Sequence, residues 1–151
     1  MGVPVRVLFL CTGNSARSQM AEALLRWLAG GRAEVHSAGT HPRPEVHPMA
    51  VATLARQYQL SAEALFPKNL DRYLAQPFDY VITVCDQAAE ACPVFPGAAT
   101  RLHWSLPDPA ASEGTPDEQQ RAFDRTAADI EARLKVWLAE PEVSARLGVA
   151  E

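Results

Sequence analysis

The chain has 151 residues, 48% of them hydrophobic, which is enough for one domain with a buried core. Its formal net charge of −4 offers no broad positive surface, so nucleic acid is not expected as a partner. The first residues lack the apolar segment of a signal peptide, and no apolar run reaches the length of a membrane-spanning helix. We therefore expect a cytoplasmic protein without a membrane partner.

The sequence contains three cysteines, Cys11, Cys85 and Cys92. An odd number suits a disulfide-stapled secreted domain badly, so these residues are expected to be catalytic, redox-active or buried. The segment between Cys85 and Cys92 is longer than the roughly two to four residues usual between zinc-binding cysteines. We therefore predict no metal site and no cofactor.

The chain begins with a predicted strand, a polar loop and a helix. Residues 5–10 form a nearly continuous apolar run, which is typical of a central strand buried on both faces. Helical spacing of apolar residues runs from about residue 15 until Gly30 and Gly31. The positions expected on the buried face of this helix are Met20, Leu24, Trp27 and Leu28.

The loop between this strand and helix is Cys11-Thr12-Gly13-Asn14-Ser15-Ala16-Arg17-Ser18. Backbone N–H groups at the start of a helix bind oxyanions, and the same field lowers the pKa of a nearby cysteine from ~8.5 to ~3.5–7.5. We therefore expect Cys11 to be a thiolate nucleophile that faces a bound oxyanion. Arg17 can offer two parallel donors to that anion. Gly13 and Asn14 tolerate the tight backbone that such a loop needs.

Cys11 also has a purely structural interpretation, because a lone cysteine after a strand is more often a small buried hydrophobe. The accompanying Gly13-Asn14 pair and Arg17 favour the nucleophile instead. A nucleotide-type phosphate loop is excluded, because no second glycine followed by lysine is present.

Strands and helices are predicted to alternate along the rest of the chain. We expect strands at residues 35–38, 80–84 and 101–104, and helices at residues 48–58, 69–74 and 86–92. The helix from residue 48 is expected to bury Val51, Leu54, Ala55 and Tyr58.

A capping box at Thr115 to Glu118, with Pro116 at the first helical position, opens a last long helix that continues until Pro141. Its predicted buried residues are Phe123, Ala127, Ile130, Leu134, Trp137 and Leu138. Residues 1–141 are expected to form the domain, and residues 142–151 a loose C-terminal tail.

The strand at residues 80–84 ends at Cys85, so Cys85 and Cys11 should emerge at the same carboxyl edge of a parallel sheet. A helix over residues 86–92 would separate Cys85 from Cys92 by about 10.5 Å, at 1.5 Å of rise per residue. Disulfide-bonded Cα atoms lie roughly 4.4–6.8 Å apart. If the two cysteines pair, this helix must unwind, which would expose a disulfide to an external dithiol protein.

Two further segments adjoin the expected site. His41 and His47 lie in a proline-rich loop and are expected to be solvated or to line the mouth of the pocket. Asp108 follows the last strand between two prolines, where its spacing alone indicates a turn residue.

The anion loop, the sequence Ser37-Ala38-Gly39-Thr40 and the pair Asp108-Pro109 together resemble the low-molecular-weight protein tyrosine phosphatase superfamily. Within it, Cys85 and Cys92 resemble those of the thioredoxin-coupled arsenate reductase branch. The resemblance covers residues 5–138. It implies an α/β, single-domain, three-layer flavodoxin-like fold with a four-stranded parallel sheet, and we expect a monomer.

The resemblance also implies a reaction, the reduction of arsenate to arsenite in arsenic detoxification. Cys11 would attack arsenate held by the loop residues and Arg17, while Asp108 protonates the departing oxygen. Cys85 would then attack the Cys11 adduct, and Cys92 would pass the disulfide to thioredoxin. The residues implied to bind the oxyanion are Thr12, Gly13, Asn14, Ser15, Ala16, Arg17 and Ser18, and those implied to brace the loop are Asn14, Ser18 and Ser37.

Two other functions remain open. The first is a tyrosine phosphatase that forms a phosphocysteine at Cys11 and needs neither Cys85 nor Cys92. Against it, Ala110 follows Asp108-Pro109 where the phosphatases usually have an aromatic residue, and Ala16 replaces their second loop cysteine. Weak activity on aryl phosphates is nevertheless expected, because phosphate and arsenate are alike in shape and charge. The second is a non-catalytic oxyanion sensor, which would need neither an acid nor a thiol relay.

Some reductases of this branch have a potassium site near the anion loop. Asn14, Glu22 and Ser37 could supply three of its ligands, but Asn69 stands where an aspartate is expected. We therefore predict no bound cation.

Overall fold

A computed structural model describes residues 3–93, 95–96 and 99–148. Its centre is a four-stranded, all-parallel sheet with the strand order β2-β1-β3-β4. The strands are β1 (Val5–Cys11), β2 (Ala33–Gly39), β3 (Tyr80–Thr83) and β4 (Thr100–His103). The predicted α/β fold and four-stranded parallel sheet are confirmed.

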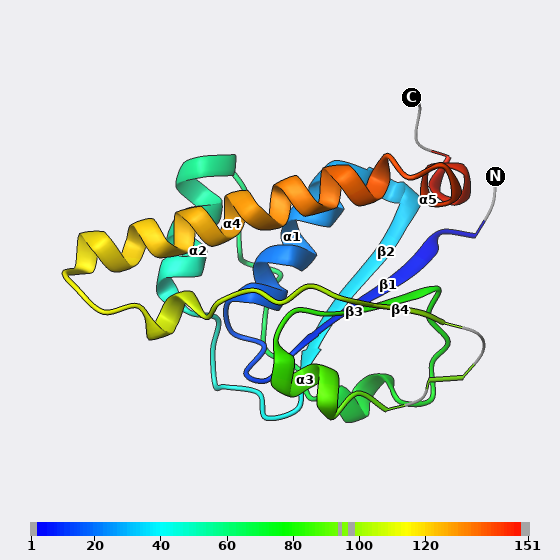
Figure 1. Cartoon of the computed structure of the whole chain (residues 1–151), viewed down its shortest axis with the longest axis horizontal. Coiled ribbons are helices and arrows are strands. Elements are labelled where there is room, and N and C mark those ends of the chain that lie inside the picture. Colours follow the sequence, from blue (N-terminus) through cyan, green and yellow to red (C-terminus); the bar gives the residue numbers. More distant parts are fainter. Residues whose placement is uncertain (1–2, 94, 97–98, 149–151) are drawn as a thin grey trace.

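Helices cover both faces of this sheet, which gives the three predicted layers. Figure 1 shows α1 and α4 over one face and α3 on the opposite side. The helices are α1 (Arg17–Ala29), α2 (Pro48–Tyr58), α3 (Asp86–Glu90), α4 (Pro116–Leu138) and α5 (Pro141–Leu147). Short 3-10 turns are found at Gly30–Arg32, Leu70–Tyr73 and Pro109–Ala111.

The longest helix, α4, begins and packs as the sequence predicts. The Thr115 hydroxyl accepts a hydrogen bond from the Glu118 N–H (3.1 Å), and the Glu118 carboxylate accepts one from the Thr115 N–H (2.9 Å). All the residues predicted on its inner face are buried, namely Phe123, Ala127, Ile130, Leu134, Trp137 and Leu138.

Two helices bury a different face from the one predicted. In α1, Trp27 is 47% exposed and packs its ring edge against Tyr58, while Leu25 is fully buried. In α2, Val51 and Ala55 are exposed, contrary to the prediction, and the buried face is formed by Ala50, Thr53 and Leu54. The buried face of α2 differs because it includes a polar residue. The buried Thr53 hydroxyl donates to Asp124 of α4 (2.6 Å), a contact that apolar periodicity cannot reveal.

The predicted loose tail is wrong for most of its length. Residues 141–147 form α5, whose Val143 and Leu147 side chains are buried in the core. Arg146 also pairs with Asp79 at 2.6 Å. A helix of seven residues, about two turns, is too short to give a periodic signal, although it is long enough to bury two apolar side chains. Residues 149–151 lie outside the described part of the chain.

The sheet determines where the site lies. β1 ends at Cys11, and β3 ends two residues before Cys85, so both cysteines leave the sheet at its carboxyl edge. Within the described ranges, no helix is both long and apolar enough to cross a membrane.

Candidate active site

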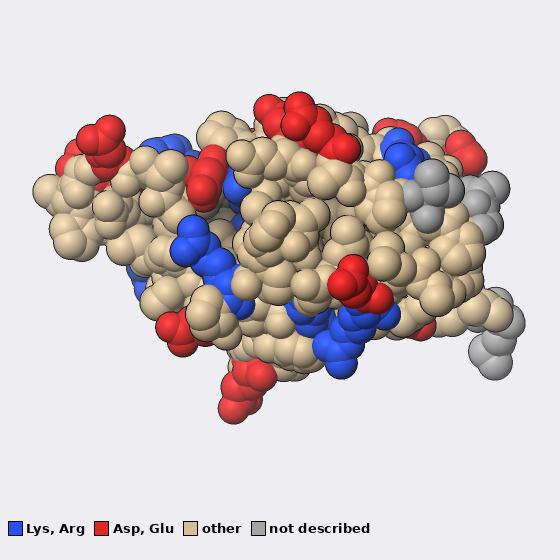
Figure 2. Space-filling model, turned by 90° about the horizontal axis from the view of Figure 1, so that it is seen from below, with Lys and Arg blue, Asp and Glu red and all other residues tan. Residues whose placement is uncertain are grey.

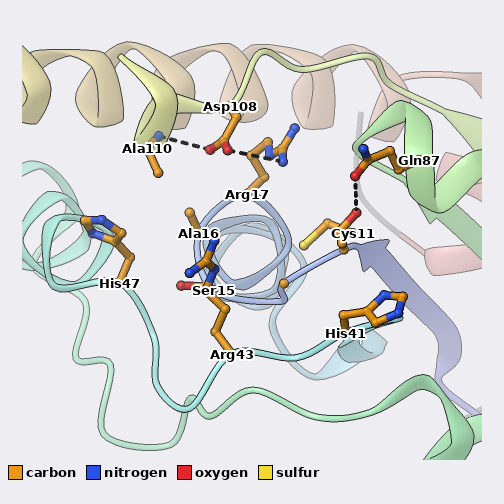
Figure 3. A pocket seen from close by; sticks show the side chains of 12 residues that line it. Cys11, Ser15, Ala16, Arg17, His41, Arg43, His47, Gln87, Asp108 and Ala110 are labelled. Atoms are coloured by element: carbon orange, nitrogen blue, oxygen red, sulfur yellow. Dashed lines mark hydrogen bonds and ion pairs between the residues drawn. The ribbon is translucent and has the colours of Figure 1, made fainter. Parts of the chain in front are cut away.

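Cys11 lies at the base of a pocket of about 570 Å³ at the carboxyl edge of the sheet. Asn14, in the loop between β1 and α1, has the left-handed backbone (φ 47°) that the sequence predicts for Gly13 or Asn14. Figure 3 shows the side chains around this pocket. They come from the anion loop, the segment after β2, α3 and the segment after β4: Cys11, Thr12, Gly13, Ser15, Ala16, Arg17, His41, Arg43, His47, Gln87, Asp108 and Ala110.

The Cys11 side chain is almost completely buried, with 2% of its surface exposed. Its sulfur accepts a hydrogen bond from the Asn14 N–H (3.1 Å) and lies 2.8 Å from the Ser18 hydroxyl. Burial raises the pKa of the Cys11 thiol, although Ser18, the Asn14 N–H and Arg17 all act to lower it. The predicted lowering is therefore wrong for the anion-free protein. Helix α1 begins only at Arg17, six residues after Cys11. The loss of hydration on burial raises the pKa of Cys11 more than the hydrogen-bond donors around the sulfur lower it.

Replacing Ser18 with alanine is expected to raise the pKa of Cys11 further, because the Ser18 hydroxyl is the strongest of the contacts that lower it. The test is the pH dependence of alkylation by iodoacetamide in a variant that retains only Cys11, since the thiolate is the reacting form. The profile should move to higher pH in Ser18→Ala. An unmoved profile would mean that Ser18 does not stabilise the thiolate.

Asn14 joins the loop to Ser18 and Ser37, as the family resemblance implies. Its amide nitrogen donates to the hydroxyls of Ser18 (2.7 Å) and Ser37 (2.9 Å). Its amide oxygen accepts hydrogen bonds from the Lys68 N–H (2.8 Å) and the Gln19 side chain (3.1 Å). The Asn14 side chain is fully buried, so this network fixes the loop from behind.

Sequence reasoning missed a buried ion pair behind the loop. The Lys68 ammonium lies 3.3 Å from the Glu22 carboxylate, and both side chains are more than nine-tenths buried. Ser37 donates to the same carboxylate oxygen (2.5 Å), and Arg26 pairs with the other oxygen (2.6 Å). Burial lowers the pKa of Lys68, and Glu22 acts to raise it. Lys68 thus shares the Glu22 carboxylate with Ser37, and no local sequence signal marks it.

Arg17 and Asp108 border the pocket together. The Arg17 guanidinium donates to the Leu106 carbonyl (2.8 Å) and lies 4.0 Å from the Asp108 carboxylate. Figure 3 shows these two side chains pointing toward each other above the loop. Asp108 also accepts a hydrogen bond from the Ala110 N–H (3.0 Å), which orients its partly exposed carboxylate. A carboxylate and a guanidinium group therefore lie beside one another at the pocket wall.

Cys85 contacts the anion loop directly. The Thr12 hydroxyl lies 3.3 Å from the Cys85 sulfur and 3.2 Å from the Gln87 amide oxygen. The Cys85 sulfur also caps α3 by accepting a hydrogen bond from the Ala88 N–H (3.4 Å). Thr12 therefore contacts both cysteines: it follows Cys11 in the chain, and its hydroxyl lies against the Cys85 sulfur.

Cys92 lies just beyond α3, which is shorter than predicted. The helix ends at Glu90, and Ala91 caps it, so the predicted extent to residue 92 is wrong by two residues. Burial raises the pKa of the half-buried Cys92 thiol. No disulfide joins Cys11, Cys85 or Cys92 in the structure. Unwinding of α3 on oxidation stays a prediction.

The segment after β2 forms the outer wall of the pocket. His41 and His47 line the pocket, in agreement with the prediction for its mouth, while Arg43 and Gln87 are lining residues that the sequence did not single out. The ring of His47 packs against Phe123 (4.6 Å). In the part of the chain that the structure describes, no three His, Cys, Asp or Glu side chains group so as to hold a metal ion.

Comparison with known proteins gives a consistent result. Residues 6–146 match the family model described as low molecular weight phosphotyrosine protein phosphatase. The chain is 37% identical over 131 residues to an arsenate reductase of Halalkalibacterium halodurans, an alignment that covers 87% of this chain and 93% of that protein.

Solved structures are similar as well. A thioredoxin-dependent arsenate reductase of Corynebacterium glutamicum superposes with a TM-score of 0.62 at 32% identity, covering 91% of this chain and 65% of that one. An arsenate reductase in the phosphate-binding state superposes with a TM-score of 0.68 at 26% identity, covering 89% of this chain and 97% of that one.

Proposed function

The chain belongs to the low molecular weight phosphotyrosine protein phosphatase family, and we propose that it reduces arsenate to arsenite through a three-cysteine relay restored by thioredoxin. One observation carries this proposal: Cys85 touches Thr12 of the Cys11 loop, with Cys92 just beyond the helix that Cys85 caps. A phosphatase that works through Cys11 alone has no use for either of the other thiols.

The first step joins Cys11 to arsenic. Arsenate enters the pocket, where the loop N–H groups and the Arg17 guanidinium neutralise its charge. Because burial favours the protonated thiol, Cys11 passes its proton to a basic oxygen of the anion as the attack begins. A sulfur–arsenic bond forms and an arsenic–oxygen bond breaks. Asp108 protonates the departing oxygen, which leaves as water.

The next steps move electrons from the thiols to arsenic. Cys85 attacks the Cys11 sulfur, and the electron pair of the sulfur–arsenic bond stays on arsenic, which leaves as arsenite. Cys92 then attacks Cys85 and frees Cys11. The Cys85–Cys92 disulfide requires α3 to unwind, because its helical rise holds the two residues apart. Thioredoxin, a dithiol protein, reduces this disulfide.

Hydrolysis of aryl phosphates is a second activity of the same site. The anion loop, Arg17 and Asp108 supply all that a phosphocysteine mechanism needs. Ala110 lines the pocket at the position where an aromatic residue would hold a tyrosine ring, so this activity is expected to be weak.

The proposal is tested by counting free thiols in reduced protein before and after arsenate is added without an electron donor. The count should fall from three to one with arsenate and stay at three with phosphate. A count that stays at three with arsenate, in protein that hydrolyses p-nitrophenyl phosphate, would contradict the reductase and leave a phosphatase.

A further inference from the structure

Arg43 is a cation in the pocket wall that has no anionic partner among the residues that the structure describes. Among described residues, the arginines in ion pairs are Arg6, Arg17, Arg26, Arg133 and Arg146. Arg43 is exposed, lines the same pocket as Cys11 and belongs to none of these pairs. Figure 3 shows its side chain pointing from its loop into the pocket, on the side away from Asp108.

The backbone holds Arg43 against the anion loop. Its N–H donates to the Gly13 carbonyl (2.9 Å), and the flanking His41 and His47 N–H groups donate to Thr12 and Ser15 (both 2.9 Å). Pro42 and Pro44 on either side restrict the backbone further. The main chain of Arg43 is therefore held against the anion loop, so its side chain starts beside Gly13.

Gly13 leaves the space that the Arg43 side chain occupies. A Cβ at residue 13 would lie 3.2 Å from the Arg43 Cγ and 3.4 Å from its Nε, which is tighter than ordinary contact. The Arg43 side chain thus lies across the loop residue that is two positions from Cys11. By contrast, the Arg17 guanidinium already donates to the Leu106 carbonyl and faces Asp108.

The charge of the whole protein makes a second cation useful. A net charge of −4 repels a doubly charged anion, so attraction must come from the pocket itself. Figure 2 shows Lys and Arg side chains interspersed with Asp and Glu side chains on one face of the molecule, without a broad positive patch. An unpaired guanidinium at the pocket mouth supplies local attraction where the anion enters.

We propose that Arg43 is a second oxyanion-binding residue, which contacts the oxygens of a tetrahedral anion that face the pocket mouth while the loop and Arg17 bind the others. The inference deepens the proposed function, since the anion is its arsenate substrate. Arg43 contributes to binding rather than to chemistry, so its loss raises KM for arsenate with little change in kcat.

The experiment measures binding of inorganic phosphate to the reduced protein by calorimetry, which is independent of turnover. The Arg43→Gln variant should bind phosphate about tenfold more weakly, as expected for loss of a charge-assisted hydrogen bond. Arg43→Lys, which keeps the charge, should lie between this variant and the unchanged protein. Arg56→Gln is the matched control, because it removes the same charge from the exposed face of α2.

Equal phosphate affinity in Arg43→Gln and the unchanged protein would overturn the proposal. This holds even if the KM for thioredoxin rises in the variant, because Arg43 would then contact thioredoxin and not the anion. An equal loss in Arg56→Gln would also overturn it, because the effect would then be one of net charge. Far-UV circular dichroism establishes that each variant is folded. If the unchanged protein fails to reduce arsenate while Arg43→Gln alone binds phosphate more weakly, the proposed function is contradicted and the binding role of Arg43 stands.

Discussion

Replacing Cys85 with serine is expected to lower arsenate reduction by about 10³-fold or more, while hydrolysis of p-nitrophenyl phosphate stays within about twofold of the unchanged protein. Cys85 is the thiol that touches Thr12 of the anion loop, and serine keeps a hydroxyl that can make the same contact. The substitution therefore removes the second nucleophile without removing the pocket. Steady-state assays of both activities on one preparation measure the two effects.

The matched variant is Cys92→Ser, which should stop the relay one step later. It has two free thiols, and arsenate should oxidise both to a Cys11–Cys85 disulfide in a single turnover. Cys85→Ser also starts with two free thiols, and both should remain after arsenate is removed. Thioredoxin should fail to support multiple turnovers in either variant. Equal arsenate reduction in Cys85→Ser and the unchanged protein would contradict the relay.

The anion loop was predictable because its chemistry is local. The residues from Cys11 to Ser18 are contiguous. A nearly continuous apolar run precedes them, and a segment with helical spacing of apolar residues follows them. The contact of Asn14 with Ser18 and Ser37 was predictable only through the family resemblance. The placement of Cys85 beside the loop followed from a general rule, since parallel strands present their carboxyl ends at one edge.

Features that depend on long-range packing were not predictable. Lys68 reaches Glu22 from a segment without an apolar periodic pattern. No sequence motif marks Arg43, and its place beside the loop depends on the hydrogen bond from its N–H to the Gly13 carbonyl. The pKa of Cys11 is another such feature. A motif indicates which donors surround the sulfur, but the loss of water depends on the complete fold, and in this protein burial is the larger effect.

Replacing Asp108 with asparagine is expected to lower kcat/KM for arsenate by about 10²–10³-fold, because an amide cannot protonate the departing oxygen. Asparagine retains an oxygen that can accept the hydrogen bond from the Ala110 N–H, so the turn at Pro109–Ala111 should persist. Kinetic assays with thioredoxin regeneration measure the loss. Asp117→Asn, an equal change of charge at the exposed start of α4, should leave the rate within about twofold.

The phosphatase activity distinguishes protonation by Asp108 from a role in holding Arg17, which lies 4.0 Å away. A general acid matters most when the leaving group is strongly basic, so Asp108→Asn should slow phenyl phosphate far more than p-nitrophenyl phosphate. A residue that only orients the Arg17 guanidinium would weaken both substrates alike, because the anion that Arg17 binds is the same in each. Equal losses would therefore assign Asp108 to positioning, and the proton for the departing oxygen would have to come from water in the open pocket.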